Sequence, residues 1–332
     1  MKNNIKVILG LPLVALLITS CGTASPSSVT FSSSSENTNY DFSIISPTGA
    51  PTAAFYQFAS SGDFETNSTA TNVAAQFATS NYDVIVFDSL KGINQITNAE
   101  TPSPYKLARI ITKGNYYLVS IDKPEGSEPT SADLIVNFGQ NGTPDTIYKS
   151  LYPDFSENTV YVTSVSDALT VLVNGTYNQE AVDYVFIAQP ALYNAMNNTS
   201  AATYGKIKIV ADIQQAWFDS TGQNGFPQAG VFVRNDVYAV HPIAFSYLLD
   251  TIDEAIETSI DDPNTVVRAL NDYGTSADQL ARFGFNSTMF AGVQAGGANG
   301  LGLTVGGIDV NAYYTSVGLS AVSEDVFLNL YL

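Results

Sequence analysis

The chain alternates short apolar runs with polar turns and with segments that have helical spacing. Because the apolar runs are continuous rather than alternating, they predict strands that are covered on both faces. Regular alternation of such strands with helices is typical of an α/β fold with mainly parallel sheets. The strands expected on this basis are residues 42–45, 83–87, 134–136, 159–163, 182–188 and 231–233.

Helix boundaries carry recognisable capping residues. Asp88 and Ser89 are expected to cap a helix that starts near Leu90. Ser164 with Asp167 resembles a capping box, and Gly175 is placed to end that helix. Residues 241–260 have the clearest amphipathic stripe of the chain. Further helices are expected over residues 53–58, 73–77, 265–270 and 276–283, and a Gly-rich loop over 291–307.

Two pairs of segments repeat the same local pattern. Residues 43–55 and 134–148 each contain a strand, a Gly-bearing turn, a proline at helix entry and a helix. In the second of these, Thr143 is the expected N-cap and Pro144 the first helical residue. Residues 83–90 and 183–192 each run from an Asp through an apolar strand and a short polar loop into a helix. The sequence therefore predicts two similarly built lobes.

The N-terminal residues have the features of an export signal. Lys2 and Lys6 precede an uncharged run over residues 7–18, which is shorter than the about 20 residues that span a bilayer. Ile18-Thr19-Ser20-Cys21 resembles the lipobox of bacterial lipoproteins, which implies a signal peptide over 1–20 and lipidation, such as palmitate, on Cys21. An ordinary secretory signal with an accidental Cys is the alternative. Residues 21–40, rich in Ser, Thr and Asn, are expected to be a flexible tether.

Charge and composition exclude several classes of function. The chain has 13 Lys+Arg against 31 Asp+Glu, a net charge of −18, which argues against nucleic-acid binding. Removal of residues 1–20 takes away two lysines and brings the net charge to −20. One Cys and one His exclude a disulfide framework and a Cys/His zinc site, and make His-dependent catalysis improbable. We expect neither a metal nor a cofactor.

Taken in order, four stretches resemble a known family. They are the turn over residues 46–51, Tyr82-Asp83-Val84-Ile85-Val86-Phe87, residues 182–190, and Gly230-Val231-Phe232-Val233 followed by His241-Pro242. Their order behind a lipobox resembles the extracytoplasmic substrate-binding proteins of ABC transporters, in the nitrate/sulfonate/taurine-like branch of the type II periplasmic binding proteins. The resemblance implies a two-lobed α/β fold with a ligand cleft between the lobes, lobe 1 formed by 41–117 and 229–332, and lobe 2 by 118–228.

The same resemblance implies how the protein works and with which partners. It implies a membrane-anchored monomer that captures a small molecule outside the cytoplasm and delivers it to an ABC permease with its ATPase. An enzyme on the same fold, of the thiamine-pyrimidine or menaquinone-pathway type, and a surface adhesin lipoprotein are the alternatives. The lipobox and the single His oppose the first alternative, and the strand–helix alternation opposes the second.

Candidate ligand contacts follow from the sheet geometry. In open α/β sheets a ligand binds outside the carboxyl ends of the strands, here the loops over 46–50, 88–89, 140–143 and 188–190. Each loop opens a helix and so presents free backbone N–H groups. The expected ligand-binding residues are Ser46, Thr48, Gly49, Ala50, Asp88, Ser89, Asn115, Tyr116, Gln140, Asn141, Gly142, Thr143, Gln189, Trp217 and Phe226.

Several of these residues have an equally good structural explanation. Asp88 either faces a ligand cation or caps its helix, and Trp217 or Phe226 either stacks on ligand or belongs to the core. The loops contain no Arg to pair with an anion. A neutral or mildly cationic ligand therefore fits somewhat better, although helix N-termini alone can hold an anion.

Overall fold

The computed structural model describes residues 40–295 and 300–329, which belong to one compact unit, Asn37–Leu332. The expected signal peptide, Cys21 and nearly all of the expected tether lie outside the described residues, as does part of the expected Gly-rich loop. No helix in the described ranges is long and apolar enough to span a membrane.

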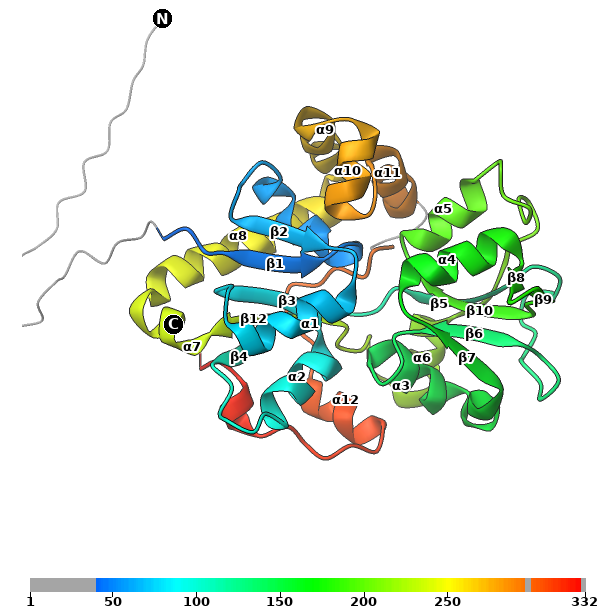
Figure 1. Cartoon of the computed structure of the whole chain (residues 1–332), viewed down its shortest axis with the longest axis horizontal. Coiled ribbons are helices and arrows are strands. Elements are labelled where there is room, and N and C mark those ends of the chain that lie inside the picture. The colour runs from blue at the N-terminus through cyan, green and yellow to red at the C-terminus, as the bar shows by residue number, and fades with distance from the viewer. Residues whose placement is uncertain (1–39, 296–299, 330–332) are drawn as a thin grey trace, which may run out of the picture. The chain divides into compact units, whose positions relative to one another are not determined.

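A five-stranded mixed sheet forms the first half of the fold (Figure 1). Its strands β1, β2 and β3 are parallel, and β12 runs antiparallel between β3 and β4. The order across this first sheet is β2 (Phe64–Asn67), β1 (Ile44–Pro47), β3 (Val84–Asp88), β12 (Ala229–Arg234) and β4 (Tyr105–Thr112).

A second five-stranded sheet repeats this arrangement. Strands β6, β7 and β10 are parallel, and β5 runs antiparallel between β10 and β11. The order is β7 (Thr159–Val162), β6 (Ile135–Phe138), β10 (Tyr184–Ala188), β5 (Tyr116–Ser120) and β11 (Lys208–Asp212), with a small hairpin of β8 (Thr176–Tyr177) and β9 (Glu180–Ala181) beside it. The α/β class is confirmed, and in each sheet four of the five strands run in the same direction, as expected for mainly parallel sheets. Each sheet is nevertheless mixed, because the strand that enters it from the other sheet runs antiparallel to both its neighbours.

The chain passes between the two sheets twice. It leaves the first sheet between Thr112 and Tyr116, and it returns between Asp212 and Ala229. A third segment supports the first crossing, since Lys113 donates its N–H to the Gly302 carbonyl and Thr304 donates to the Ile111 carbonyl. The exact lobe bounds expected from the sequence stay a prediction.

Helices cover both faces of each sheet. Figure 1 shows α4 and α5 on one face of the second sheet, with α3 and α6 on the other. The helices are η1 (Ala50–Phe58), α1 (Ala70–Thr79), α2 (Ser89–Thr97), α3 (Thr143–Leu151), η2 (Pro153–Asn158), α4 (Val165–Asn174), α5 (Ala191–Asn197), α6 (Ile213–Thr221), α7 (Asn235–Val240), α8 (Pro242–Asp261), α9 (Pro263–Tyr273), α10 (Ser276–Phe283), α11 (Ser287–Ala295), α12 (Val310–Ser316) and η3 (Glu324–Val326).

Most local helix signals act as expected. Asp88 caps α2, Ser164 and Asp167 form a capping box at α4, and Gly175 ends α4 in the left-handed conformation. Two predictions need correction. Thr143 is the first residue of α3 rather than its N-cap, which is Gly142. The expected loop over 291–307 begins inside α11, because Phe290 and Val293 bury an apolar face there.

Three hydrophobic cores hold the two sheets. One lies between the first sheet and the η1/α8 side, and another between the second sheet and α4/α5. The third contains residues of both sheets: Phe87 and Phe232 of the first are in one cluster with Tyr116 and Phe186 of the second. Because side chains alternate along a strand, each sheet contributes one face to its own core and the other face to this shared core.

The amino ends of the two third strands, β3 and β10, are tied down in the same way. Asp83 accepts the N–H of Ser43 at 3.1 Å and forms an ion pair with Arg234 at 3.7 Å. Asp183 accepts the N–H of Leu134 at 2.8 Å and pairs with Lys123 at 3.3 Å. Asp83 and Asp183, which occupy the same place in the two repeated sequence segments, therefore have equivalent roles in the two sheets.

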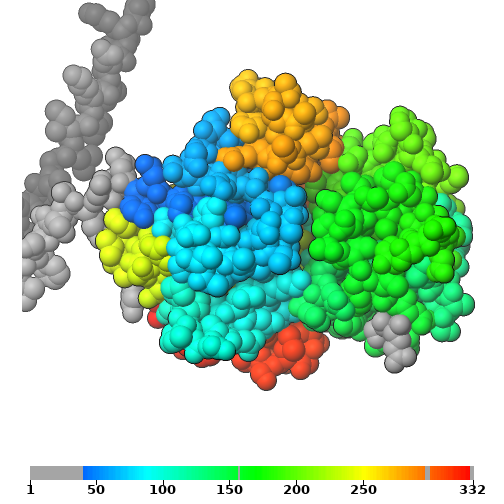
Figure 2. Space-filling model, in the orientation of Figure 1, coloured from blue at the N-terminus to red at the C-terminus, as the bar shows by residue number. Residues whose placement is uncertain are grey.

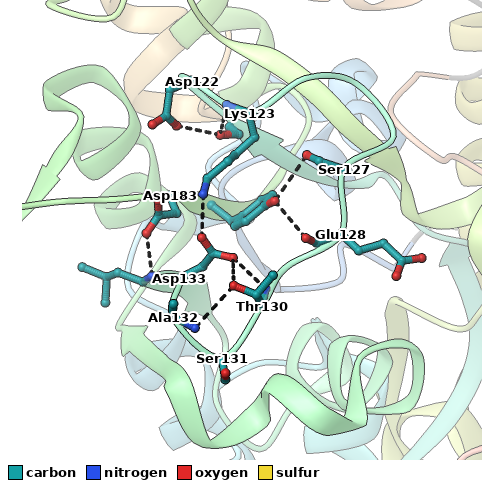
Figure 3. A network of polar contacts seen from close by, with 12 residues as sticks. Asp122, Lys123, Ser127, Glu128, Thr130, Ser131, Ala132, Asp133 and Asp183 are labelled. Carbon is teal, nitrogen blue, oxygen red and sulfur yellow. Dashed lines mark hydrogen bonds and ion pairs between the residues drawn. The ribbon is translucent and has the colours of Figure 1, made fainter.

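Lys123 also joins a loop to the second sheet (Figure 3). Its ammonium lies 2.7 Å from Asp133, which in turn accepts hydrogen bonds from the N–H and hydroxyl of Thr130. Burial alone would raise the pKa of the Asp133 carboxyl, but the hydrogen bonds from Lys123 and Thr130 hold it below its ordinary value.

Candidate functional site

A cavity of about 180 Å³ lies at the carboxyl ends of the parallel strands of both sheets. Figure 2 shows the surfaces of the two halves meeting along a seam, with the green second half beside the blue and cyan first half. Helix N-terminal turns make most of the wall: Thr48, Gly49 and Ala50 at η1, Asp88 and Lys91 at α2, Gly139 and Pro144 at α3, Thr163, Ser164, Val165 and Ser166 at α4, and Gln189 and Pro190 at α5. The N-termini of five helical segments thus converge on one space.

The two chain crossings contribute further walls. Asn115, which is fully buried, donates from its amide to the Gln189 carbonyl at 2.8 Å and accepts from the Gln228 amide at 2.9 Å. The Tyr116 ring stacks on Phe226 and meets Phe138 edge to face. Burial, and then the nearby Asp88 carboxyl, raise the pKa of Tyr116 well above its ordinary value, so its hydroxyl stays neutral.

Asp88 is bound by backbone groups of both halves. Its Oδ1 accepts the N–H of Lys91 in α2 at 2.9 Å, and its Oδ2 accepts the N–H of Thr143 in α3 at 3.0 Å. Burial raises the pKa of Asp88, whereas these two hydrogen bonds oppose the rise. With each oxygen already accepting an N–H, Asp88 acts as a helix cap and as a link to the second sheet.

Lys91 is the only cationic side chain among the residues that line the cavity, and Asp88 is the only anionic one. Within the described residues no hydrogen bond or ion pair is formed by the Lys91 ammonium. Its Cε atom lies 2.7 Å from where a Cβ on Gly142 would be placed, so the side chain extends across to the start of α3. The Lys91 charge acts on the nearby Asp88 carboxyl and opposes the rise of its pKa, but the two form no direct ion pair, so the ammonium can also reach a negatively charged group in the cavity.

Two more polar groups face the cavity. Gln189 uses its amide oxygen to cap α5, accepting from the Tyr193 N–H at 3.0 Å. At α4 the Ser164 hydroxyl is engaged in the capping box, while the first-turn N–H groups of Val165 and Ser166 have no acceptor within the helix. Gly49 has a φ of +118°, which favours glycine, and a Cβ there would meet nothing within 4 Å. The Gly49 N–H already donates to the Phe283 carbonyl at 2.7 Å, so a bound molecule could approach the Gly49 Cα but would find no free N–H there.

The structure brings together about half of the expected ligand-binding residues. Thr48, Gly49, Ala50, Asp88, Asn115, Tyr116 and Gln189 line the cavity.

The other expected residues lie outside the lining. The hydroxyl of Ser46 bonds to the Pro47 carbonyl and that of Ser89 to the Pro227 carbonyl, and both side chains are buried. Gln140 and Asn141 are exposed on the turn before α3. Gly142 and Thr143 pack against Lys91 and Asp88 rather than on the cavity wall.

Trp217 and Phe226 are core residues. Both are fully buried, and Phe226 lies behind Tyr116, with Trp217 behind Phe226. Large aromatic side chains close to a crossing therefore fill the shared core, and Tyr116 alone of the three aromatics reaches the cavity.

Sequence reasoning missed Lys91, Phe138, Gln228 and the 163–166 turn. The last of these had a usable signal, because the strand ending at Val162 and the capping box after it place this turn at the same sheet edge. Lys91 lies in the first turn of α2 and could have been found by asking which first-turn side chains share that edge.

The described ranges contain no group of three or more His, Cys, Asp or Glu side chains that could hold a metal ion. His241, the only histidine of the chain, stacks on Tyr40 at 4.0 Å and is not part of the cavity wall.

Solved structures share this fold at low sequence identity. A ligand-binding component of an ABC-type import system from Staphylococcus aureus, solved with zinc bound, has a TM-score of 0.59 at 8% identity, covering 86% of this chain and 95% of that chain. The periplasmic aliphatic sulphonate binding protein SsuA from Escherichia coli has a TM-score of 0.56 at 12% identity, covering 82% and 88%. The Candida albicans CA3427 gene product, described as having the generic periplasmic binding protein fold, has a TM-score of 0.51 at 9% identity, covering 87% and 93%.

These matches show that the chain has the periplasmic binding protein fold, and they confirm the fold expected from the sequence. No family model matches the sequence, and no curated protein matches it.

Proposed function

We propose that this protein is an extracytoplasmic solute-binding protein of an ABC transporter. It captures a small molecule in the cavity between the two sheets and delivers it to a permease, with no bond made or broken. The observation that carries this proposal is the convergence of helix N-termini from both sheets on one cavity. The printed functions of the structural neighbours, which include ligand-binding components of import systems, support it.

The ligand we infer is small and carries a negatively charged group. A cavity volume of about 180 Å³ suits a small molecule. The Lys91 ammonium at the cavity wall and the first-turn N–H groups of Val165 and Ser166 favour an anion. This departs from the neutral or cationic ligand favoured by the sequence, because only the fold reveals that Lys91 reaches the cavity.

The proposed setting is the outer face of a membrane. Cys21 would carry the lipid anchor, residues 21–40 would be the tether, and the two lobes would have the bounds expected from the sequence. Neither alternative gains support: His241 lies outside the cavity, which opposes a His-dependent enzyme, and the parallel strands oppose an adhesin built from antiparallel repeats.

A thermal-shift screen of the full-length chain tests the binding function. The panel contains nitrate, sulfonates, amino acids, polyamines, pyrimidines and flavins, each titrated over a wide concentration range. A specific ligand at about 100 times its Kd adds about 2.7 kcal/mol to the free energy of unfolding and raises Tm by several degrees. If no member of the panel shifts Tm, the proposal loses its main support.

Lys91→Met sharpens the result for any ligand found. We expect affinity for an anionic ligand to fall by about 10- to 100-fold, because a charge-assisted hydrogen bond is lost. Lys208→Met, at an exposed position on the edge strand β11, is the matched control and should bind as the parent does. Equal binding by both variants would contradict the anionic ligand class.

The anchor has its own test. We expect Cys21→Ala to release the protein from cell membranes into the soluble fraction without changing its Tm. A variant that stays in the membrane fraction would contradict lipidation at Cys21.

A further inference from the structure

One carboxylate joins the two sheets through backbone groups. Asp88 ends β3 and caps α2, which packs on the first sheet, while its Oδ2 accepts the first-turn N–H of α3, which packs on the second sheet. Asp88 and Thr143 are 55 residues apart in the sequence. This is a direct polar bond between the two halves, in addition to the two covalent crossings.

The surroundings of this bond reinforce it. The Pro227 carbonyl, in the second crossing, accepts the hydroxyl of Ser89 at 2.8 Å and that of Thr143 at 3.4 Å. Gly142 approaches Lys91 so closely that a Cβ would lie 2.7 Å from its Cε atom and 3.2 Å from Asp88 Oδ2. The N-termini of α2 and α3 are therefore in close contact at Gly142, beside the second crossing.

We propose that the arrangement described here is the closed one, and that Asp88 is a positioning residue that latches the two sheets in it without the help of a ligand. This inference rests on the proposed function and adds to it that the two sheets separate to admit a ligand. Both oxygens of Asp88 accept N–H groups, so the carboxylate stabilises closure rather than recognising the ligand. Its loss lowers the fraction of molecules that are competent to bind tightly and weakens apparent affinity by the same factor.

Two variants remove the latch from opposite sides. Thr143→Pro deletes the donor N–H at the first helical position, where proline is well tolerated. Thr143→Ser is its control, since it keeps both the N–H and the hydroxyl and removes only the methyl group. Asp88→Asn keeps one acceptor oxygen for the helix cap and cannot accept both N–H groups. Asp309→Asn is its control, because Asp309 caps α12 through the N–H of Ala312 alone, without a bond between the sheets.

The measurement is the distance between spin labels on the two halves, in the full-length chain without ligand. Cys21→Ser removes the only native cysteine, and Thr71→Cys on α1 and Thr170→Cys on α4, both exposed, carry the labels. We expect one short distance in the parent and in both controls. In Thr143→Pro and Asp88→Asn a longer population appears, and the ratio of closed to open molecules falls about tenfold, as expected for losing one hydrogen bond to a charged acceptor.

The possible outcomes separate the latch from the proposed function. A parent that is already open, or latch variants with the parent's distances, would overturn the latch while leaving ligand binding intact. If the distance between the spin labels stays the same in every variant and with every compound that shifts Tm, the two sheets do not open and close, and the closure on which the latch depends is overturned. Circular dichroism of each variant identifies one that fails to fold, and since Asp88→Asn and Thr143→Pro act on different residues, either one suffices for the test.

Discussion

The two sheets resemble each other at the amino ends of their strands and differ in chemistry at the carboxyl ends. Both have the parallel strands in the same order, with the entering strand antiparallel in the fourth place. At the amino ends, Asp83 ties β3 to the start of β1 and pairs with Arg234, and Asp183 ties β10 to the start of β6 and pairs with Lys123. The similar arrangement at the amino ends therefore serves the structure of the fold in both halves.

The carboxyl ends differ. The third strand of the first sheet ends in Asp88, followed by Lys91 in the first turn of α2, whereas that of the second sheet ends in Ala188, followed by Gln189 and Pro190. The first half thus contributes the charged side chains of Asp88 and Lys91 to the cavity, and the second contributes the Gln189 amide and the Pro190 ring. The repeated architecture therefore positions the site, while the specificity of the site comes from residues that are not repeated.

The largest expected effect comes from the core that the two sheets share. Trp217→Ala should lower the free energy of unfolding by about 3–5 kcal/mol, because it removes a fully buried ring that packs on Phe226 and Tyr313. Hydrogen exchange should then show reduced protection in both β1 and β6. Leu172→Ala, in the core of the second sheet alone, is the comparison and should reduce protection mainly in β6. Loss confined to one sheet in both variants would mean that the shared core does not couple the halves.

The next effect separates the two equivalent aspartates. Asp83 is nearly buried and accepts from Ser43 and Tyr40 besides pairing with Arg234, whereas the side chain of Asp183 is 28% exposed. Asp83→Ala should cost about 3 kcal/mol and Asp183→Ala about 1.5 kcal/mol in urea unfolding. If the two variants lost the same free energy of unfolding, the deeper burial of Asp83 would not make it more important than Asp183.

The smallest effect is a pH dependence at Asp133, which precedes β6 of the second sheet. Because the pKa of Asp133 is held below its ordinary value, its contribution to stability is present above the ordinary Asp pKa and is lost as the pH falls through the lowered one. The parent should therefore lose more stability between about pH 5 and pH 2 than Asp133→Asn does. Asp154→Asn, at an exposed position, should follow the parent. High salt should shrink the difference, since Lys123 is partly exposed.

Much of the fold could be predicted because its signals are local. The apolar run of β3, the capping box of Ser164 and Asp167, and the stripe of α8 each act within a few residues. Strands β2 and β11 were not predicted, since edge strands bury few side chains, as the exposed Glu65 and Lys208 show.

The site was predicted in part for the same reason. The rule that ligands bind at the carboxyl ends of strands found the loops at Thr48, Asp88 and Gln189. It could not tell Trp217 in the core from Tyr116 on the cavity wall, because both are large aromatics near a crossing and only the path of the chain separates them.

By itself, the sequence determined the α/β class, the two similar halves and the helix starts that surround the cavity, because periodicity and capping depend on neighbouring residues. Only the tertiary structure decided which side chains meet. In the folded protein Lys91 lies on the cavity wall, the Oδ2 atom of Asp88 accepts the N–H of Thr143 from the other half, and Trp217 is buried in the shared core. These contacts join residues far apart in the chain, so their energies depend on how the two sheets pack and not on any local pattern.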